Sequence, residues 1–284
     1  MLEIGLSSCN AVIDDALLSR FAAGGIKHIE VSTTTMELAD ALDWSNIKDC
    51  SVRCGVGLWS FHLPFSPFRV IDVSNPALAD FTVEYFSSLI EKAASVGVKR
   101  FIIHPSAEPI ADEDRPARIA CAKKSLSRLA DLADKFGGVI CVEDLPRTCL
   151  GRNSAELMDI VSAHPSLRVC FDTNHMLSES LVDFIKNTAE KIETTHVSDY
   201  DFLNERHWLP GEGKIDWKSL YETLIGVGYK GTWLYELRFE QTPNISRPRD
   251  LTCEDFYKNA NEIFSGSPIT VIGTPQGELK AWNA

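Results

Sequence analysis

The chain has 284 residues, of which 44% are hydrophobic and 24% are charged, and its formal net charge is −12. Such a composition is typical of a globular protein with a sizeable core, and no apolar run approaches the roughly 20 residues that a membrane-spanning helix needs. The acidic balance argues against an extended nucleic-acid surface, which usually carries a basic stripe. The cysteines form no CxxC pair and the N-terminus shows no cleavage signature, so we expect reduced thiols and a cytoplasmic protein.

Short β-rich runs alternate with longer segments of helical periodicity along the chain. The predicted strands are 4–8, 28–32, 56–62, 100–104, 139–143, 168–172, 193–198 and 232–237, and the predicted helical segments include 77–96, 116–136, 154–163, 178–191 and 217–228. Glycines often follow a helical segment, where a left-handed C-cap is useful. Asn153 precedes another segment and suits an N-cap.

Eight strands that alternate with helices predict an α/β protein with a single (β/α)8 TIM barrel. The main alternative, a doubly wound open sheet, would normally have a glycine-rich phosphate loop after its first strand, and GLSSCNAVID is not one. We expect the barrel to occupy residues 1–265 and residues 266–284 to form a C-terminal tail, either packed or frayed.

Metal-binding residue types recur at the ends of the predicted strands. Glu143, Asp172, His196 and Glu236 end strands five to eight, and side chains at the C-terminal ends of barrel strands converge on one mouth. Three carboxylates with one imidazole suit a divalent cation such as Mn²⁺, Co²⁺, Mg²⁺ or Zn²⁺. Each of the four alone also suits a cap, a turn or a salt bridge, so the prediction rests on their coincidence.

Further histidines lie near the same predicted mouth. His62 and His104 end strands three and four, His175 follows Asp172 by three residues, and His207 lies in the loop after strand seven. They are predicted either to bind additional metals or to donate hydrogen bonds to a polyhydroxylated substrate. Two other histidines, one at the start of a strand and one before a proline, are assigned structural roles.

Several segments, taken in order, resemble those of one superfamily. These segments are HLPF, DVSNP, IIHPS, VEDL, FDTNH, HVSD, H-x-x-PGEGKIDW and YELR. They resemble the xylose-isomerase-like barrels, which include sugar and sugar-phosphate isomerases and epimerases similar to D-tagatose 3-epimerase, and also endonuclease IV. The resemblance extends from Ile4 to about Phe264, and HVSD followed by PGEGKIDW is its most specific part.

In the epimerase branch, the resemblance implies one divalent metal held by Glu143, Asp172, His196 and Glu236. It also implies that the two glutamates are the catalytic acid/base pair on opposite faces of the sugar. The metal would bind a carbonyl and an adjacent hydroxyl and stabilise an enediolate while the glutamates move the proton. Trp59 and Trp208 are predicted to form an apolar wall against the sugar or to belong to the core, and for Phe61 we favour the core.

In the endonuclease IV branch, the resemblance implies three zinc ions. His62, His104 and Glu143 would hold the first, and Glu143 would share a second with Asp172, His196 and Glu236. The third would be held by His175, His207 and an aspartate. This chain has Glu205 in place of that aspartate, so the third site is the point at which the chain departs from the pattern.

The charge of −12 and the scarcity of basic residues near the mouth favour the sugar enzyme, whereas the number of histidines favours the zinc phosphodiesterase acting on abasic DNA. The basic residues are Arg69, Arg147, Arg152, Arg206, Lys214 and Arg238. A small-molecule sugar is therefore the predicted partner, without nucleic acid or membrane. A non-catalytic binding barrel is disfavoured because both glutamates are present. The sugar, its phosphorylation, the number of metals and the formation of a homodimer are left open.

Overall fold

The computed structural model describes residues 1–65 and 70–281, and these form a single (β/α)8 TIM barrel. The strands of the barrel are β1 (Ile4–Ser7), β2 (His28–Ser32), β3 (Gly57–His62), β4 (Arg100–Ile103), β5 (Val139–Glu143), β6 (Arg168–Asp172), β7 (Ile192–His196) and β8 (Trp233–Tyr235). The predicted fold class is therefore confirmed, and the observed strand bounds lie within two residues of the predicted ones.

The strands follow the order β7-β6-β5-β4-β3-β2-β1-β8, and each neighbouring pair is parallel. Between the two end strands, Val197 forms an isolated parallel bridge with Tyr235. The Val197 amide donates to the carbonyl of Leu234 at 2.8 Å, and the Glu236 amide donates to the carbonyl of Val197 at 3.2 Å. These bonds nearly close the sheet into a ring, which brings the end of β8 beside the end of β7.

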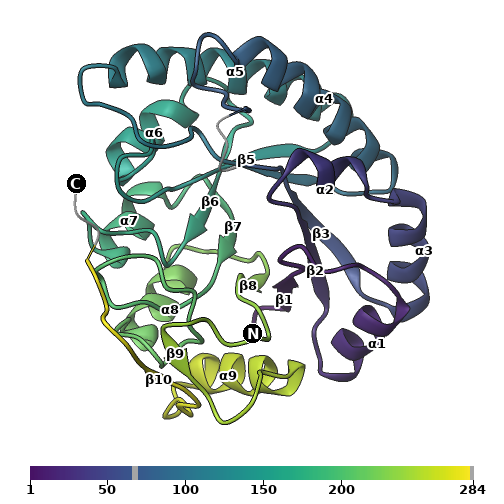
Figure 1. Cartoon of the computed structure of the whole chain (residues 1–284), viewed down its shortest axis with the longest axis vertical. Helices are drawn as coiled ribbons and strands as arrows, with labels where there is room; N and C mark the ends of the chain where they lie inside the picture. Colours follow the sequence, from purple (N-terminus) through teal and green to yellow (C-terminus); the bar gives the residue numbers. More distant parts are fainter. Residues whose placement is uncertain (66–69, 282–284) are drawn as a thin grey trace.

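The helices surround the sheet (Figure 1). They are α1 (Asp15–Ala23), α2 (Met36–Asp40), α3 (Trp44–Cys54), α4 (Ala79–Ser95), α5 (Arg115–Lys135), α6 (Ser154–Val161), α7 (Leu181–Thr188), α8 (Trp217–Gly226) and α9 (Cys253–Ser265). The predicted N-cap of α6 is confirmed, because the Asn153 side chain accepts a hydrogen bond from the Glu156 amide. Gly97 follows α4 with a φ of 103°, a conformation that glycine adopts without strain.

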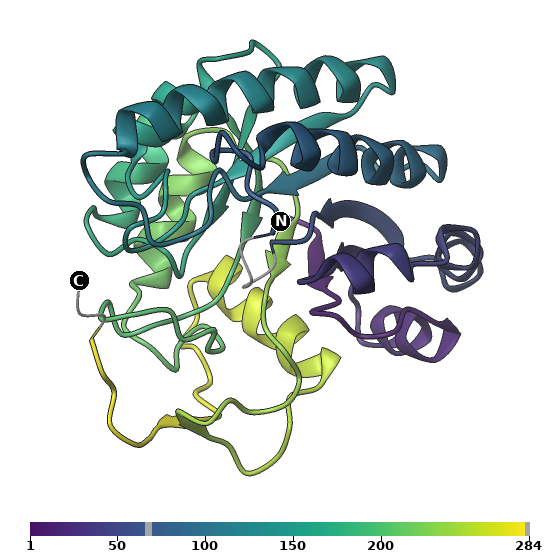
Figure 2. The same cartoon turned by 45° about the horizontal axis from the view of Figure 1, so that its top comes forward.

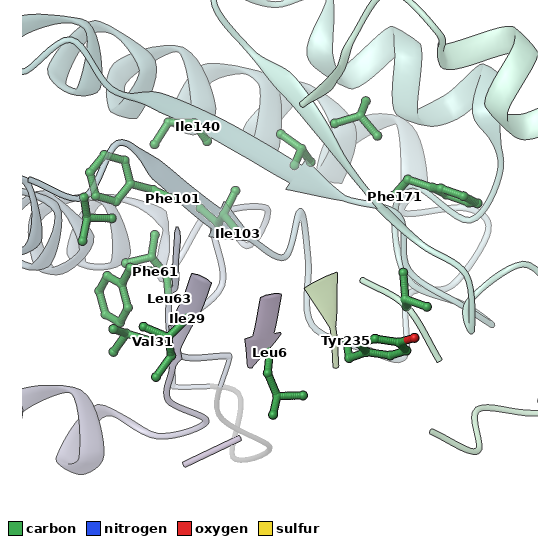
Figure 3. Packing of buried hydrophobic residues seen from close by; sticks show 14 of the residues in the cluster. Leu6, Ile29, Val31, Phe61, Leu63, Phe101, Ile103, Ile140, Phe171 and Tyr235 are labelled. Carbon is green, nitrogen blue, oxygen red and sulfur yellow. The ribbon is translucent and has the colours of Figure 1, made fainter. Parts of the chain in front are cut away.

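Alternation along each strand separates the core from the site. In β6, Val169 and Phe171 belong to the main hydrophobic core, and Phe171 stacks on Phe184 of α7 with ring centroids 5.2 Å apart. Figure 3 shows side chains of this core along several strands. Because successive side chains point to opposite faces of a strand, Cys170 and Asp172 point into the barrel instead. The same period brings the polar residues of the other strands together.

Asp199, in the segment HVSD, organises the long loop after β7. Its carboxylate accepts hydrogen bonds from the amides of Gly211 at 2.8 Å and Ile215 at 3.2 Å, and from the indole of Trp217 at 2.8 Å. A Cβ at Gly213 would lie 2.2 Å from this carboxylate, so only glycine fits there. The two most specific segments of the sequence, HVSD and PGEGKIDW, are thus physically joined.

The segment after α9 runs back along this loop (Figure 2). Its short strand β10 (Thr274–Pro275) pairs antiparallel with β9 (Ile245–Ser246). The Gly273 amide donates to Glu212 at 2.7 Å, and Arg206 donates to the carbonyl of Lys280 at 2.8 Å. The domain boundary at residue 265 stays a prediction. None of the described helices is both long and apolar enough to cross a membrane.

Candidate metal and active site

Glu143 lies at the centre of the polar cluster inside the barrel. Its Oε2 atom is 3.0 Å from Nε2 of His62 and 3.1 Å from Nε2 of His104, and its Oε1 atom is 3.0 Å from Nδ1 of His196. The side chain is only 1% exposed. Burial by itself would raise the pKa of Glu143, but the neighbouring imidazoles of His196 and His104 lower it well below its usual range. Glu143 therefore joins the histidines of three strands.

A second arm of the cluster contains the four residues predicted to hold a metal. Glu143, Asp172, His196 and Glu236 offer donor atoms that all lie within 4.8 Å of one another. Oε2 of Glu236 is 3.3 Å and Oδ2 of Asp172 is 4.0 Å from Nδ1 of His196. Oδ2 of Asp172 is buried without a hydrogen-bond partner. Such an orphaned acceptor is unfavourable unless a cation or water satisfies it, so the four residues fit a divalent ion.

The two glutamates of this group differ in their protonation. Burial and the negative charges of Glu143 and Asp172 raise the pKa of Glu236 to about 8, although His196 opposes the shift. Without a metal, Glu143 is therefore ionised at neutral pH while Glu236 is largely protonated. Two carboxyl groups whose environments move their pKa values apart can serve as an acid and a base.

His62 and His104 form a further donor group with Glu143, also within 4.8 Å. Burial would lower the pKa of His62, but its hydrogen bond to Glu143 raises it to about 9. Burial lowers the pKa of His104, and the hydrogen bond to Glu143 offsets this only in part. Phe65 stacks on His104, with ring centroids 4.4 Å apart and planes at 19°. The group lies beside the first one and shares Glu143 with it.

The remaining three predicted residues do not form such a group. Nε2 of His175 is 2.9 Å from Glu205, whereas Nδ1 of His207 is hydrogen-bonded to the carbonyl of Glu236 at 3.2 Å. Within residues 1–65 and 70–281, no set of three or more donors within 4.8 Å includes His175, Glu205 or His207. Nδ1 of His175 does lie 3.5 Å from Oδ2 of Asp172 and 3.8 Å from Oε1 of Glu143. The structure thus brings His62 and His104 into the candidate metal-binding cluster, places His175 against it and leaves Glu205 and His207 beside it.

Arg147 occupies the space next to Glu205. Its guanidinium pairs with Glu205, with Glu108 at 2.6 Å and with the side chain of Asn204 at 3.1 Å, and so joins three loops at the mouth. Burial would raise the pKa of Glu205, but hydrogen bonding to His175 and the charge of Arg147 lower it strongly. The carboxylate of Glu205 is therefore already neutralised by a cation of the chain itself.

Two other basic residues from the sequence analysis, Arg206 and Arg152, are also paired with carboxylates. Arg206 is buried and pairs with Asp201 at 2.8 Å, and Arg152 lies 3.5 Å from Asp112. Arg69, which the sequence suggested as a basic residue near the mouth, lies outside the described residues.

A cavity of about 570 Å³ opens beside the cluster. It is lined by Phe65, His104, Ser106, Arg147 and Glu205, together with Thr34, Thr35, Ala107, Glu108, Leu145, Pro146 and Cys149. The lining thus includes the stacked rings of Phe65 and His104 and the ion pair of Arg147 with Glu205. This size is typical of a site for a small molecule.

The aromatic residues proposed from the sequence do not line this cavity. Phe61 is fully buried and packs edge-on against Trp44 at 4.9 Å, as favoured above. Trp59 lies under the guanidinium of Arg100 at 3.6 Å, and Trp208 is 1% exposed. Phe65 is the aromatic residue that lines the cavity instead. Nothing in the sequence pattern distinguishes it from the aromatic residues of the core.

Two inward-facing residues were missed because they lie inside strands and not at their ends. Glu30, in β2, is 3.0 Å from Nε2 of His196. Cys170, in β6, offers a donor within 4.8 Å of Glu143 and His196. Strand alternation would have identified both, since each lies between two apolar residues that face the core.

Comparisons with known proteins agree with this architecture. Residues 18–255 match the family described as xylose isomerase-like TIM barrel. The chain is 25% identical over 120 residues to a fructoselysine 3-epimerase of Escherichia coli O157:H7, covering 40% of this chain and 44% of that protein. It is 30% identical over 181 residues to a probable endonuclease 4 of Bacillus subtilis, covering 56% of this chain and 59% of that protein.

The fold also matches solved structures. A D-tagatose 3-epimerase-like protein superposes with a TM-score of 0.78 at 19% identity, covering 93% of this chain and 97% of that one. The match to the curated relatives named above spans less than two thirds of their own length, so their activities do not transfer directly. The family match covers most of the chain, and the chain belongs to the xylose isomerase-like TIM barrel family.

Proposed function

We propose that the protein is a divalent-metal-dependent isomerase or epimerase of a sugar, sugar phosphate or related polyol ketone. The observation that carries this proposal is the donor group of Glu143, Asp172, His196 and Glu236, which includes a buried carboxylate oxygen of Asp172 without a partner. Relatives named as a fructoselysine 3-epimerase and a D-tagatose 3-epimerase-like protein support the sugar chemistry.

The four donors would hold one Mn²⁺, Co²⁺, Mg²⁺ or Zn²⁺ ion, because hard carboxylates and one imidazole suit all of these. When bound, the ion would supply Lewis-acid polarisation of a substrate carbonyl and an adjacent hydroxyl, which makes the C–H bond between them more acidic. Three ionised carboxylates would leave the occupied site with a net charge of −1.

The residues of the chain carry the proton transfer in this proposal. Glu236, whose side chain is 16% exposed at the mouth, removes a proton from, or returns it to, a substrate carbon. Glu143 lies within 3.1 Å of ring nitrogens of His62, His104 and His196 and acts from the other side of the metal-binding cluster. A pair of this kind contributes about 10²- to 10⁴-fold to the rate.

The cavity beside His104 would receive the rest of the substrate. The ring of Phe65 supplies an apolar face for the C–H bonds of a sugar, while Ser106 and Arg147 offer hydrogen-bond donors to its hydroxyls. His175, Glu205 and His207 would then contact substrate oxygens, as one of the predicted alternatives stated.

The alternative proposal is a zinc phosphodiesterase similar to endonuclease IV. It is favoured by the second donor group, His62, His104 and Glu143, and by the 30% identity to a probable endonuclease 4. Two zinc ions that share Glu143 would satisfy both groups. The ion pair between Arg147 and Glu205 argues against a third zinc. The net charge of −12 argues against a duplex substrate.

One experiment separates these proposals. Purified protein, stripped with EDTA and reloaded with Mn²⁺, Co²⁺, Mg²⁺ or Zn²⁺, is incubated with D-fructose, D-tagatose and D-psicose, with their phosphates, and separately with an abasic-site oligonucleotide. Sugar interconversion that depends on the metal and is lost in Glu143→Gln supports the isomerase or epimerase. Incision of the oligonucleotide that is lost in His104→Ala, without sugar interconversion, would replace it with the phosphodiesterase.

A further inference from the structure

Glu30 is a buried carboxylate for which the proposed chemistry has no direct use. It lies in the middle of β2, between Ile29 and Val31 of the core, and its exposure is 0%. Within the described part of the chain it forms no ion pair with a lysine or arginine. A buried carboxylate is unfavourable unless it is paired and hydrogen-bonded, so its partners indicate what it does.

Glu30 has two partners, and both contact the same oxygen. The hydroxyl of Ser60 on β3 donates to Oε2 at 2.7 Å, and Nε2 of His196 lies 3.0 Å from that atom. The other oxygen, Oε1, is buried without a partner. Glu30 is thus directed at His196 by the neighbouring strand and is 0% exposed, like His196 itself.

The two nitrogens of His196 face opposite surroundings. Nε2 faces Glu30, while Nδ1 lies 3.0 Å from Glu143, 3.3 Å from Glu236 and 4.0 Å from Asp172. A carboxylate only accepts hydrogen bonds, so Glu30 requires the proton on Nε2. The lone pair of Nδ1 then points at the three carboxylates, which is where a cation would lie.

We propose that Glu30 is a positioning residue that fixes the tautomer and ring orientation of His196 for metal binding, and that Ser60 holds Glu30 in place. This inference rests on the proposed metal-dependent function. A carboxylate behind a ligating imidazole orients the ring and increases its basicity, and loss of such a partner typically weakens metal affinity by about 10- to 100-fold. Glu30 never contacts the ion or the substrate in this arrangement.

The test compares two variants with a matched control. Glu30→Ala removes the acceptor, whereas Glu30→Gln keeps the shape and an acceptor oxygen but removes the charge. Glu193→Gln is the control, because Glu193 lies on β7 with His196 but pairs with Arg100 at 2.8 Å. Circular dichroism and thermal unfolding in EDTA identify variants that fold, and Glu30→Gln serves if Glu30→Ala does not.

Two readouts other than activity are used. Titration calorimetry with Mn²⁺ measures the Kd, which should rise by about 100-fold in Glu30→Ala and about 10-fold in Glu30→Gln, and stay within about 2-fold of the wild type in Glu193→Gln. In the zinc-loaded wild type, ¹⁵N NMR should show His196 protonated at Nε2 with slow exchange. This signal should be retained in Glu30→Gln and weakened in Glu30→Ala.

The outcomes separate the two proposals. If the wild type binds Mn²⁺ or Zn²⁺ and the affinity is unchanged in the Glu30 variants that fold, the role of Glu30 is overturned and the proposed function still stands. An unchanged Nε2 proton in a folded Glu30→Ala variant overturns that role as well. Wild-type protein that binds no divalent ion overturns the metal-dependent function and the role of Glu30 with it.

Discussion

Replacing Glu236 with glutamine tests the acid/base pair with little change of shape. Glutamine keeps the size of the side chain at the end of β8, but it cannot exchange a proton with a substrate carbon. It also reduces the three carboxylates of the donor group to two. Burial and the negative charges of Glu143 and Asp172 raise the pKa of Glu236 to about 8. A neutral glutamine at this position avoids the repulsion between these carboxylates.

The expected loss can be stated from these contacts. General acid–base catalysis contributes about 10²- to 10⁴-fold, which corresponds to roughly 2.7–5.4 kcal/mol of barrier. Because Glu143, Asp172 and His196 still offer donor atoms, Mn²⁺ should still bind, with a higher Kd, and saturating metal should not restore the rate. The folded state should be at least as stable as the wild type, since a poorly solvated carboxyl group has been removed.

The assay follows interconversion of a ketohexose by chromatography, at a Mn²⁺ concentration that saturates each variant. Glu193→Gln should retain the wild-type kcat, because Glu193 lies near the start of β7 whereas His196 lies at its end. A Glu236→Gln protein whose kcat stays within about 3-fold of the wild type would refute the assignment of Glu236 to proton transfer.

Three further predictions concern pH, metal and core. In EDTA, the free energy of unfolding should fall as the pH rises from about 7 to 9. Folding raises the pKa of His62 from 6.5 to about 9 and that of Glu236 from 4.5 to about 8, so stability present at lower pH is lost as these groups deprotonate. A free energy of unfolding, measured in urea, that stays constant or rises over this pH range contradicts the prediction. Saturating Mn²⁺ should raise the Tm relative to EDTA, and by more at pH 8 than at pH 6, because the ion replaces those protons. Scanning calorimetry with and without metal measures the difference. An unchanged Tm contradicts the proposed metal site. Phe171→Ala should lower the free energy of unfolding by about 3–5 kcal/mol, because Phe171 is 0% exposed and stacked on Phe184; a loss below about 1 kcal/mol in urea melts contradicts the packing.

The fold was accessible from the sequence because two periods are superimposed in it. Most strands are short runs rich in apolar residues, and helical segments, several of them followed by a glycine, separate these runs. In β6, Phe171 and Asp172 occupy neighbouring positions yet belong to the core and to the site. The residue at the end of a strand points either to the core or into the barrel. A carboxylate at that position therefore indicated the inward face and the site.

What the sequence could not provide were contacts that depend on distant strands. The central position of Glu143, which touches histidines from β3, β7 and the end of β4, follows from closure of the barrel and not from any local pattern. The pairing of Arg147 with Glu205 joins residues 58 positions apart. A one-dimensional pattern carries no information on which of several cations will reach a given carboxylate.

Glu30 and Phe65 were missed for different reasons. Glu30 is the single acidic residue of the strand HIEVS and lies in its middle, so a search for polar residues at strand ends does not find it. Its inward direction nevertheless follows from strand alternation. Phe65 lies in a loop after β3, and loop conformation is set by tertiary contacts such as its stacking on His104. Only the first of these could have been inferred from the sequence.

The most direct test of the central claim is solvent exchange at the substrate carbon. A ketohexose is incubated with the protein in D₂O, and deuterium at the carbon next to the carbonyl is measured by ¹H NMR. The account predicts incorporation with Mn²⁺, none with EDTA, and none above background in Glu143→Gln or Glu236→Gln. Interconversion of the sugar without deuterium incorporation, or incorporation that persists without either glutamate, would contradict it.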